Sequence, residues 1–305
     1  MINRVTILHE TLEWAEQGLA SQFVEKGLVV NLLDIRTAST ADIIKKTGTP
    51  QEGVVLNRVY ASVANRNYKY NLKTLEILKE LEDLGYDVIN SYQTSLFDYS
   101  KFDSAKKMLK DGISTPDLIL IKNVSVASIK KATKFAKENG YPLILKRNMS
   151  GRGKDLFKIE NENELIEKMN YVFSDDYVQN YAAGFVLQKF VVANRPYDCR
   201  IAIVDDKFAF AYGRTLISRK DNDEPWLASV SNGSKIIEYT PSIEEINLAK
   251  AATRSVGALF NEVDMNFSAE GPVIIENNPT PNYDPEEIDL VKNAVELMIK
   301  KFQNK

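Results

Sequence analysis

The sequence predicts a mixed α/β fold built from three consecutive parts: an N-terminal parallel α/β domain followed by two α+β subdomains. Strand and helix signals alternate over residues 1–93, which is the pattern of a parallel sheet with helices on both faces. Residues 94–183 contain a basic, glycine-containing loop between two strands, and residues 184–305 contain an acidic β-hairpin. A chain of 305 residues is long enough for two or three compact units.

Four short apolar runs in the first part are predicted strands: Val5–Leu8, Val29–Ile35, Gly53–Leu56 and Asp87–Ile89. Before the last of these, leucines recur at helical spacing from Leu72 to Leu84, with Asn71 as the expected N-cap and Gly85 just after the helix. Arg58 follows the third strand, at a carboxyl end where open α/β sheets bind ligands. We therefore expect Arg58 to contact a substrate, although an arginine at a strand end is more often a solvated surface charge.

The second part is predicted to begin with an amphipathic helix, Lys101–Lys110, and to continue with a helix capped by Ser125. A buried strand from Tyr141 to Lys146 then leads into a basic loop, Arg147–Asp155. Its glycines let backbone N–H groups approach an anion closely, and Lys146 adds a fixed charge beside them. The loop is neither a Walker motif nor a Rossmann fingerprint, because no helix follows it. Taken alone, it also fits a flexible hairpin.

Three strands are predicted at the start of the third part: Phe185–Val192, Asp198–Val204 and Phe208–Arg214. Asp198 and Arg200 are two residues apart and so share a face, and Arg214 ends the returning strand. Two arginines on a sheet that also carries the acidic hairpin would neutralise phosphate, whereas a lone strand arginine is normally a surface residue. The remaining predicted elements are a polar loop over 218–234, a helix capped by Ser242 and Glu245, and a final helix, Glu286–Phe302.

Residues 262–281 form the acidic hairpin. Antiparallel pairing about a turn centred on Glu270 sets Asp264 opposite Glu276, and Asn278 lies on the same face as Glu276. Two carboxylates that close repel each other unless a cation lies between them, and with an amide oxygen they suit Mg²⁺. The alternative is a hairpin with scattered surface acids. The Asn-Asn-Pro-Thr-Pro sequence that follows the buried strand favours the metal site.

Composition excludes several functional classes. The net charge of −3 argues against general nucleic-acid binding. No apolar run approaches the roughly 18 residues of a membrane span, and no signal-peptide pattern is present. Cys199 is the only cysteine and can form no intrachain disulfide, so we expect a cytoplasmic protein with neither nucleic-acid nor membrane partners. His9 is the only histidine, which excludes zinc sites built from several histidines.

The order of these motifs resembles the ATP-grasp superfamily, and within it the carboxylate–amine ligases related to ribosomal-protein-S6 glutamate ligase and the lysine-biosynthesis ligase. The resemblance rests on four motifs in the correct order: Lys146, the Ser150–Lys154 loop, Asp198-x-Arg200, and Asp264 with Glu276-x-Asn278. The segment Leu56-Asn57-Arg58 is similar to the N-terminal domain of that family. The segment from Lys101 to Gly112-Ile113-Ser114-Thr115-Pro116 is similar to the start of its ATP domain.

The resemblance implies a site that binds ATP and Mg²⁺, or Mn²⁺ in its place. It implies that Asp264, Glu276 and Asn278 hold the metal, and that Arg200 and Arg214 are catalytic contacts to an acyl-phosphate. It also implies nucleotide contacts from Lys101, Lys146, Ser150, Gly151, Gly153 and Asp198, and an adenine hinge formed by Gln188, Lys189, Phe190 and Val191.

The implied function is an ATP-dependent carboxylate–amine ligase that forms an amide through an acyl-phosphate and releases ADP and phosphate. Its substrate would be a small molecule or peptide with a carboxylate and an amine, and members of that family are often homo-oligomers. Three alternatives are a regulatory ATP-binding protein with little turnover, similar to synapsin, a ligase that acts on a protein or peptide tail, and an α/β protein whose loop and hairpin have no catalytic role. ADP formation that depends on substrate separates the ligases from the others.

Overall fold

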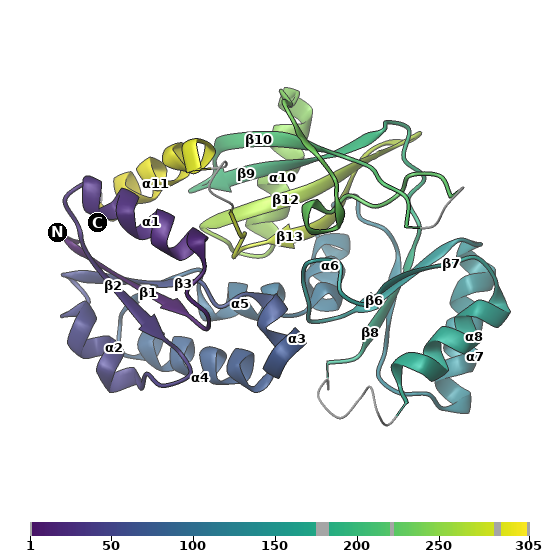
Figure 1. Cartoon of the computed structure of the whole chain (residues 1–305), viewed down its shortest axis with the longest axis horizontal. Helices are drawn as coiled ribbons and strands as arrows, with labels where there is room; N and C mark the ends of the chain where they lie inside the picture. The colour runs from purple at the N-terminus through teal and green to yellow at the C-terminus, as the bar shows by residue number, and fades with distance from the viewer. Residues whose placement is uncertain (1, 175–182, 220–222, 284–287, 304–305) are drawn as a thin grey trace.

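Three β-sheets organise the chain (Figure 1). The computed structural model describes residues 2–174, 183–219, 223–283 and 288–303, and within them the first sheet is parallel and the other two are antiparallel. The mixed α/β class predicted from the sequence is therefore confirmed. Among the described helices, none is long and apolar enough to cross a membrane.

The first sheet has the strand order β2-β1-β3-β4, with β1 Arg4–His9, β2 Val29–Asp34, β3 Gly53–Asn57 and β4 Asp87–Ile89. Helix α1 (Trp14–Glu25) covers one face, and α2 (Thr40–Thr47) and α4 (Lys69–Asp83) cover the other (Figure 1). Shorter helices complete this unit: η1 Ala61–Val63, α3 Ala64–Asn67 and α5 Tyr92–Asp98. The parallel pairing predicted from the alternating pattern is present. Parallel strands need crossover connections, and the helices on the two faces of the sheet provide them.

One expected helix cap is wrong. Helix α4 begins at Lys69, so Asn71 lies inside its first turn, where it is fully buried. The residue before the helix, Tyr68, is itself helical because η1 and α3 lead directly into α4. The chain therefore does not enter α4 from an extended residue, and the Nδ2 of Asn71 instead donates to the carbonyl of Tyr60 at 2.9 Å.

The second sheet has the order β5-β8-β6-β7, with β5 Leu118–Ile121, β6 Leu143–Arg147, β7 Leu156–Ile159 and β8 Phe185–Lys189. Helices α7 (Val126–Asn139) and α8 (Glu162–Val172) pack on it, and α6 (Lys101–Lys110) lies between it and the third sheet. The sequence interpretation assigns the run from Phe185 to the third part, whereas β8 pairs with β5 and β6 inside the second sheet. Strand β8 carries apolar side chains on both faces, which suits its position inside the sheet.

The third sheet has the order β11-β10-β9-β12-β13, with β9 Tyr197–Val204, β10 Lys207–Thr215, β11 Ile236–Ile237, β12 Phe260–Ser268 and β13 Gly271–Asn278. The helical elements of this unit are η2 Val230–Asn232, α10 Ile243–Ser255 and α11 Ile288–Gln303. The predicted capping box of Ser242 and Glu245 starts α10, which ends at Ser255, shortly before Gly257 takes a φ of +67°. The predicted start of the last helix, Glu286, lies outside the described residues.

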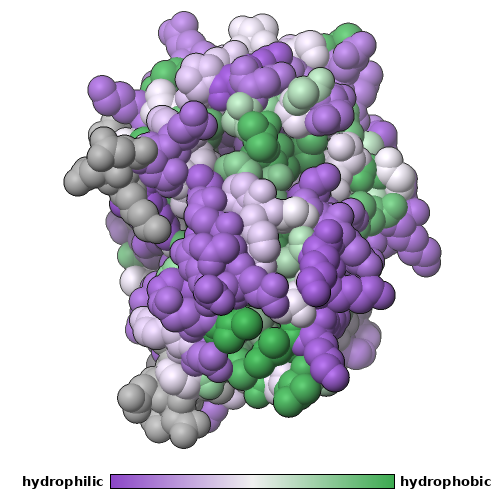
Figure 2. Space-filling model, turned by 90° about the vertical axis from the view of Figure 1, so that its right-hand side faces the viewer, coloured by the Kyte–Doolittle hydropathy of each residue, from purple (hydrophilic) through white to green (hydrophobic). Residues whose placement is uncertain are grey.

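Side chains on the two faces of β9 pack into two different hydrophobic cores, and this connects the units. Cys199, Ile201 and Ile203 face α10 and α6, while Ala202 and Val204 face a core shared with α1, α11 and the first sheet. The first and third sheets are thus held together by α11, and the second sheet lies at the opposite end (Figure 1). In a view of that end, hydrophilic residues dominate the surface and hydrophobic residues form separate groups (Figure 2).

Candidate active site

A cavity of about 460 Å³ lies where the three units meet. Its wall includes residues of all three, and every nucleotide, metal and catalytic residue predicted above lines it: Lys101, Lys146, Ser150, Gly151, Gly153, Gln188, Lys189, Phe190, Val191, Asp198, Arg200, Arg214, Asp264, Glu276 and Asn278. The wall carries eight Lys and Arg side chains and four Asp and Glu side chains. An anionic ligand is therefore favoured in this cavity, although the whole chain is acidic.

The acidic hairpin has the predicted pairing, and a bulge produces it. Ser268 pairs with Gly271, and this register alone would set Asp264 opposite Ile275. The register shifts between Asp264 and Met265, so that Asp264 lies opposite Glu276 and Glu262 opposite Asn278. The predicted neighbours on one face of the hairpin are confirmed, by a local geometry that the sequence did not indicate.

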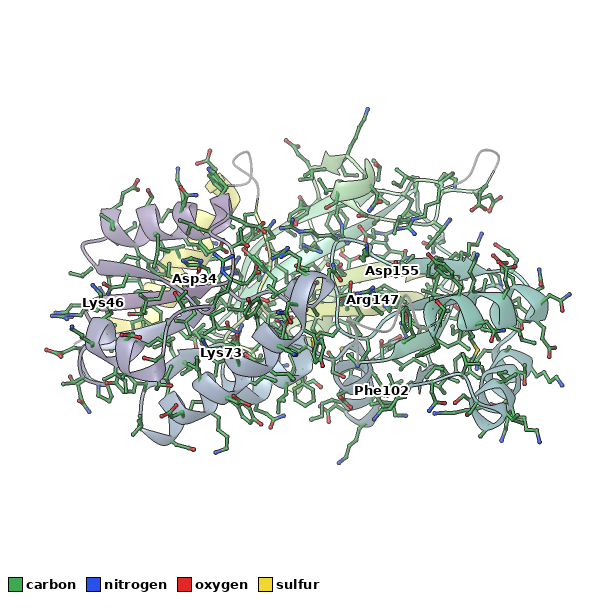
Figure 3. The ribbon with its side chains drawn as sticks, turned by 60° about the horizontal axis from the view of Figure 1, so that its bottom comes forward. Asp34, Lys46, Lys73, Phe102, Arg147 and Asp155 are labelled. Atoms are coloured by element: carbon green, nitrogen blue, oxygen red, sulfur yellow. The ribbon has the colours of Figure 1, made fainter. Side chains whose placement is uncertain are left out.

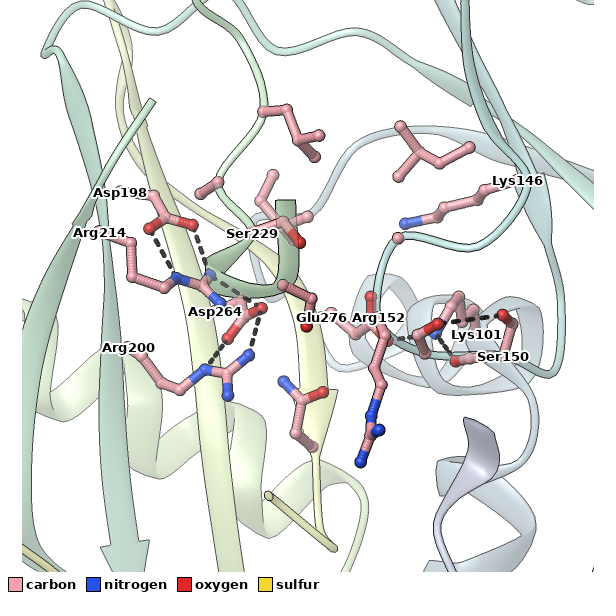
Figure 4. Close-up of a pocket in the computed structure, with 18 of the residues that line it drawn as sticks. Lys101, Lys146, Ser150, Arg152, Asp198, Arg200, Arg214, Ser229, Asp264 and Glu276 are labelled. Carbon is pink, nitrogen blue, oxygen red and sulfur yellow. Dashed lines mark hydrogen bonds and ion pairs between the residues drawn. The ribbon is translucent and has the colours of Figure 1, made fainter. Parts of the chain in front are cut away.

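Asp264 lies between two arginines (Figure 4). Its carboxylate accepts hydrogen bonds from Arg200, at 2.6 and 3.1 Å, and lies 3.0 Å from the Nη2 of Arg214. Arg214 also makes two hydrogen bonds, at 3.0 and 2.6 Å, to the carboxylate of Asp198. Burial alone would raise the pKa of Asp264, but the charges of Arg200 and Arg214 outweigh it and hold that pKa well below its usual range. Asp264 is thus ionised at every physiological pH.

Two lysines approach the site from the second unit (Figure 4). The ammonium of Lys101 contacts the carboxylate of Glu276 and donates to the carbonyl of Ser150 at 2.8 Å. The side chain of Lys146, near the end of β6, makes no hydrogen bond or ion pair within the described residues. Burial lowers the pKa of Lys146 to about 8, although Glu276 and Asp264 oppose that shift. The ammonium of Lys146 is therefore a buried cation that feels the charges of Glu276 and Asp264 but makes no direct ion pair.

The glycine loop contacts the first and third units. In the first unit, the hydroxyl of Ser150 donates to Asn65 at 2.8 Å, and Arg152 forms an ion pair with Glu13. At the base of the loop Arg147 contacts Asp155 at 2.5 Å, and the two lie together in Figure 3. Toward the third unit, the carbonyl of Gly153 accepts from Arg219 at 2.9 Å. The loop thus lies over the cavity and contacts both neighbouring units.

Arg58 does not line the cavity. Its side chain is 1 % exposed and lies 3.5 Å from the carboxylate of Glu16, and its Nη2 donates to the hydroxyl of Tyr60 at 3.1 Å and to the carbonyl of Pro281. Tyr60 and Pro281 are the cavity residues in front of it. Arg58 therefore supports the cavity wall from behind, and the substrate contact predicted for it stays a prediction.

Sequence reasoning missed two acids near the site. Glu262 is fully buried and lies 3.2 Å from the Nη1 of Arg200. The period of two along a strand places it on the face of Asp264 and could have revealed it. Asp98, the last residue of α5, accepts from the hydroxyl of Thr280 at 2.6 Å, and burial raises its pKa to about 6. No motif surrounds Asp98, so the sequence carried no signal for it.

The predicted metal ligands fit Mg²⁺ by their chemistry. Asp264 and Glu276 supply carboxylates, and the amide nitrogen of Asn278 donates to the carbonyl of Glu262 at 3.2 Å, which leaves its oxygen for a cation. Among the described residues, no three His, Cys, Asp or Glu side chains form a ready metal cluster. At the predicted set, Lys101 contacts one carboxylate oxygen of Glu276 and both arginines contact Asp264, so a metal would share these two carboxylates with cationic side chains.

The fold and the cavity define an ATP-grasp protein. A solved structure of the ATP-grasp ligase PsnB, complexed with a phosphomimetic variant of its minimal precursor, Mg and ADP, superposes with a TM-score of 0.68 at 16 % identity, covering 99 % of this chain and 100 % of that one. A family model described as RimK-like ATP-grasp domain matches residues 99–301. The chain therefore belongs to the RimK-like ATP-grasp family.

Curated relatives in this family carry the names of ligases. A probable alpha-L-glutamate ligase of Legionella pneumophila (strain Corby) is 22 % identical over 229 residues, covering 74 % of this chain and 71 % of that protein. The alpha-aminoadipate–LysW ligase LysX of Saccharolobus solfataricus is 24 % identical over 205 residues, covering 67 % and 69 %. The family and the ligase class predicted from the sequence are confirmed.

Proposed function

We propose that this protein is an ATP- and Mg²⁺-dependent carboxylate–amine ligase that activates a carboxylate as an acyl-phosphate. The observation that carries the proposal is the placement of Lys146 in the cavity: a buried ammonium that makes no direct ion pair within the described residues, opposite the paired acids and arginines of the third sheet. A triphosphate would supply a direct partner for this charge. In this assignment residues 1–93 contribute the substrate side, and the two following subdomains clamp the nucleotide.

Lys146 and the Ser150–Lys154 loop would contact the phosphates of ATP, and Gln188 to Val191 would contact its base. Asp264, Glu276 and Asn278 would hold Mg²⁺, which supplies charge neutralisation for the triphosphate when it is bound. Lys101 contacts Glu276 and the carbonyl of Ser150, so it links the metal side of the site to the loop.

The reaction then has two displacements. A substrate carboxylate oxygen attacks the γ-phosphorus, and the bond from that phosphorus to ADP breaks. The amine nitrogen next attacks the acyl carbon, the C–N bond forms, phosphate leaves with the C–O bond electrons, and the amine proton passes to phosphate or water. Arg200 and Arg214 would stabilise the charge on the phosphoryl oxygens, since both guanidinium groups reach the cavity from the third sheet. The glycine loop would exclude water, which protects the acyl-phosphate from hydrolysis.

The names of related proteins support a substrate class. They include a probable alpha-L-glutamate ligase, an alpha-aminoadipate–LysW ligase and the ligase PsnB, which was solved in complex with a precursor peptide. We therefore infer that an amino acid is one partner and that the other is an amino acid, a peptide or a protein tail.

ADP release in the presence of Mg²⁺ and a panel of amino acids and peptides tests the proposal. Glu276→Gln should abolish ADP release while thermal unfolding stays within about 2 °C of the wild type. Glu270→Gln, in the exposed turn of the same hairpin, is the matched control and should leave both unchanged. ATP binding without ADP release from any substrate would favour the regulatory alternative, and full turnover by Glu276→Gln would refute the metal assignment.

A further inference from the structure

Part of the cavity wall is apolar. The apolar residues that line the cavity include Ile144 of β6, Leu156 of β7, Phe190 and Val191 after β8, and Leu216, Trp226 and Leu227 of the third unit. Ile144 pairs with Gln188 across the second sheet, so this part of the wall adjoins the predicted hinge. A flat apolar slot beside the polar region suits the base of a nucleotide whose phosphates lie at Lys146.

Trp226 closes this slot from the third unit. Its ring lies 6.3 Å from the ring of Phe190, at an interplanar angle of 67°. The main chain holds it there, since the N–H of Trp226 donates to the carbonyl of Ile217 at 3.0 Å and Leu227 bridges to the same residue. Phe190 belongs to the hinge segment, so two aromatic rings from different units face the same part of the cavity.

A second contact fixes the segment around Trp226 against the second sheet. The ammonium of Lys158, on β7, lies 3.2 Å from the carboxylate of Asp223 and 5.4 Å from the centroid of the Phe190 ring. The indole Nε1 of Trp226 is shielded from solvent and has no hydrogen-bond partner within the described residues.

We propose that Trp226 is a nucleotide-binding residue, whose indole packs with Phe190 against the base of ATP. This inference rests on the proposed function, because it takes ATP as the ligand. It gives part of the polar 218–234 loop a role: residues 223–227 carry the ring that covers the base. Stacking of a base on an aromatic side chain is worth about 5- to 150-fold in affinity, so Trp226→Ala should weaken ATP binding within that range.

The two tryptophans of the chain, Trp14 and Trp226, allow a direct test. Trp14 packs against the core of the first sheet and does not line the cavity. In Trp14→Phe, Trp226 is the only remaining tryptophan, and its emission should change on titration with ATP and Mg²⁺ with the same midpoint that calorimetry gives. Calorimetry on Trp14→Phe should match the wild type.

Inorganic triphosphate with Mg²⁺ separates base contacts from a general loss of structure. Trp226→Ala should weaken the binding of ATP but leave the binding of inorganic triphosphate unchanged. The ATP affinity of Trp226→Phe should lie between those of Trp226→Ala and the wild type. If ATP binds the wild type while Trp226→Ala binds it equally tightly, or loses both ligands in parallel, the inference is overturned and the proposed function stands. If the wild type binds no ATP, the proposed function itself fails.

Discussion

The ammonium of Lys101, in the first turn of α6, contacts the carboxylate of Glu276 on β13 and donates to the carbonyl of Ser150 at 2.8 Å. One side chain therefore joins a proposed metal ligand to the start of the glycine loop. Lys101 thus contacts the carboxylate that would also bind a divalent ion. Metal binding and release of this lysine should then be coupled, since a carboxylate oxygen that serves both gains from only one at a time.

Lys101→Met should have opposite effects on the affinities for Mn²⁺ and for ATP. Without the lysine, Glu276 is free, and Mn²⁺ in the absence of nucleotide should bind about tenfold more tightly, which corresponds to about 1.4 kcal/mol. ATP should bind more weakly, because a cation is lost from the cavity. Electron paramagnetic resonance of Mn²⁺ and calorimetry with ATP measure the two effects. Lys106→Met, on the exposed side of the same helix, is the control, and equal Mn²⁺ affinity in both variants would contradict the coupling.

In the acidic hairpin, the sequence predicts which residues face each other but not the local geometry that brings them together. The residues that face each other, Asp264 and Glu276, could be predicted from the antiparallel rule, yet the turn lies at Ala269 and Glu270 and a bulge restores the expected pairing. A bulge depends on how both faces of a strand pack, which a single sequence does not reveal. The pairing was therefore correct although the geometry behind it differs from the predicted one.

The remaining differences also arise from contacts between distant segments. Local spacing placed the cationic and acidic motifs on the correct strands. It could not show that β8 inserts between β5 and β6, nor that Arg58 has Glu16 behind the cavity wall as its partner. In both cases the deciding neighbour is more than 35 residues away in the chain, so no window of local pattern contains it.

ATP affinity should fall as the pH rises through the pKa of Lys146. Burial lowers that pKa to about 8, so the ammonium is charged below pH 8 and neutral well above it. A bound triphosphate favours the charged form, and binding above pH 8 must therefore take up a proton. The apparent dissociation constant should then rise by up to about tenfold per pH unit between pH 8 and 10.

Lys146→Arg provides the control for this profile, because a guanidinium stays charged throughout the range. Calorimetry from pH 7 to 10 should give a flat profile for this variant, even if its affinity is lower at every pH. A flat wild-type profile would contradict the assignment of Lys146 to the phosphates.

Gly153 is the glycine of the loop whose replacement should impair turnover most directly. Its φ is +64°, and a Cβ there would lie 2.9 Å from the Nδ2 of Asn232 and 3.3 Å from the Nη2 of Arg219. Gly153→Ala should therefore push the loop away from the third unit and lower ADP release by tenfold or more. The free energy of unfolding should fall by only about 1 kcal/mol, the cost of a left-handed alanine.

Gly112→Ala is the matched control, since Gly112 has a φ of +76° and open space around its Cβ position. The Gly112→Ala variant should show a similar decrease in the free energy of unfolding and should keep full ADP release. Adding Asn232→Ala to Gly153→Ala removes one of the two close neighbours and should restore part of the activity. A double variant no more active than Gly153→Ala would show that contact with Asn232 is not the cause.

The ion pair of Arg58 and Glu16 should govern stability and leave substrate affinity largely unchanged. Both side chains are almost fully buried, and their closest atoms are 3.5 Å apart. Arg58→Met leaves the carboxylate of Glu16 buried without its cation and should lower the free energy of unfolding by about 3–5 kcal/mol. The combination Arg58→Met/Glu16→Gln removes both charges and should be more stable than Arg58→Met alone. Urea unfolding of the three proteins measures this coupling, and steady-state kinetics of whichever variants remain folded gives KM. A KM that rises strongly in Arg58→Met while the unfolding curve stays unchanged would instead restore Arg58 as a direct substrate contact.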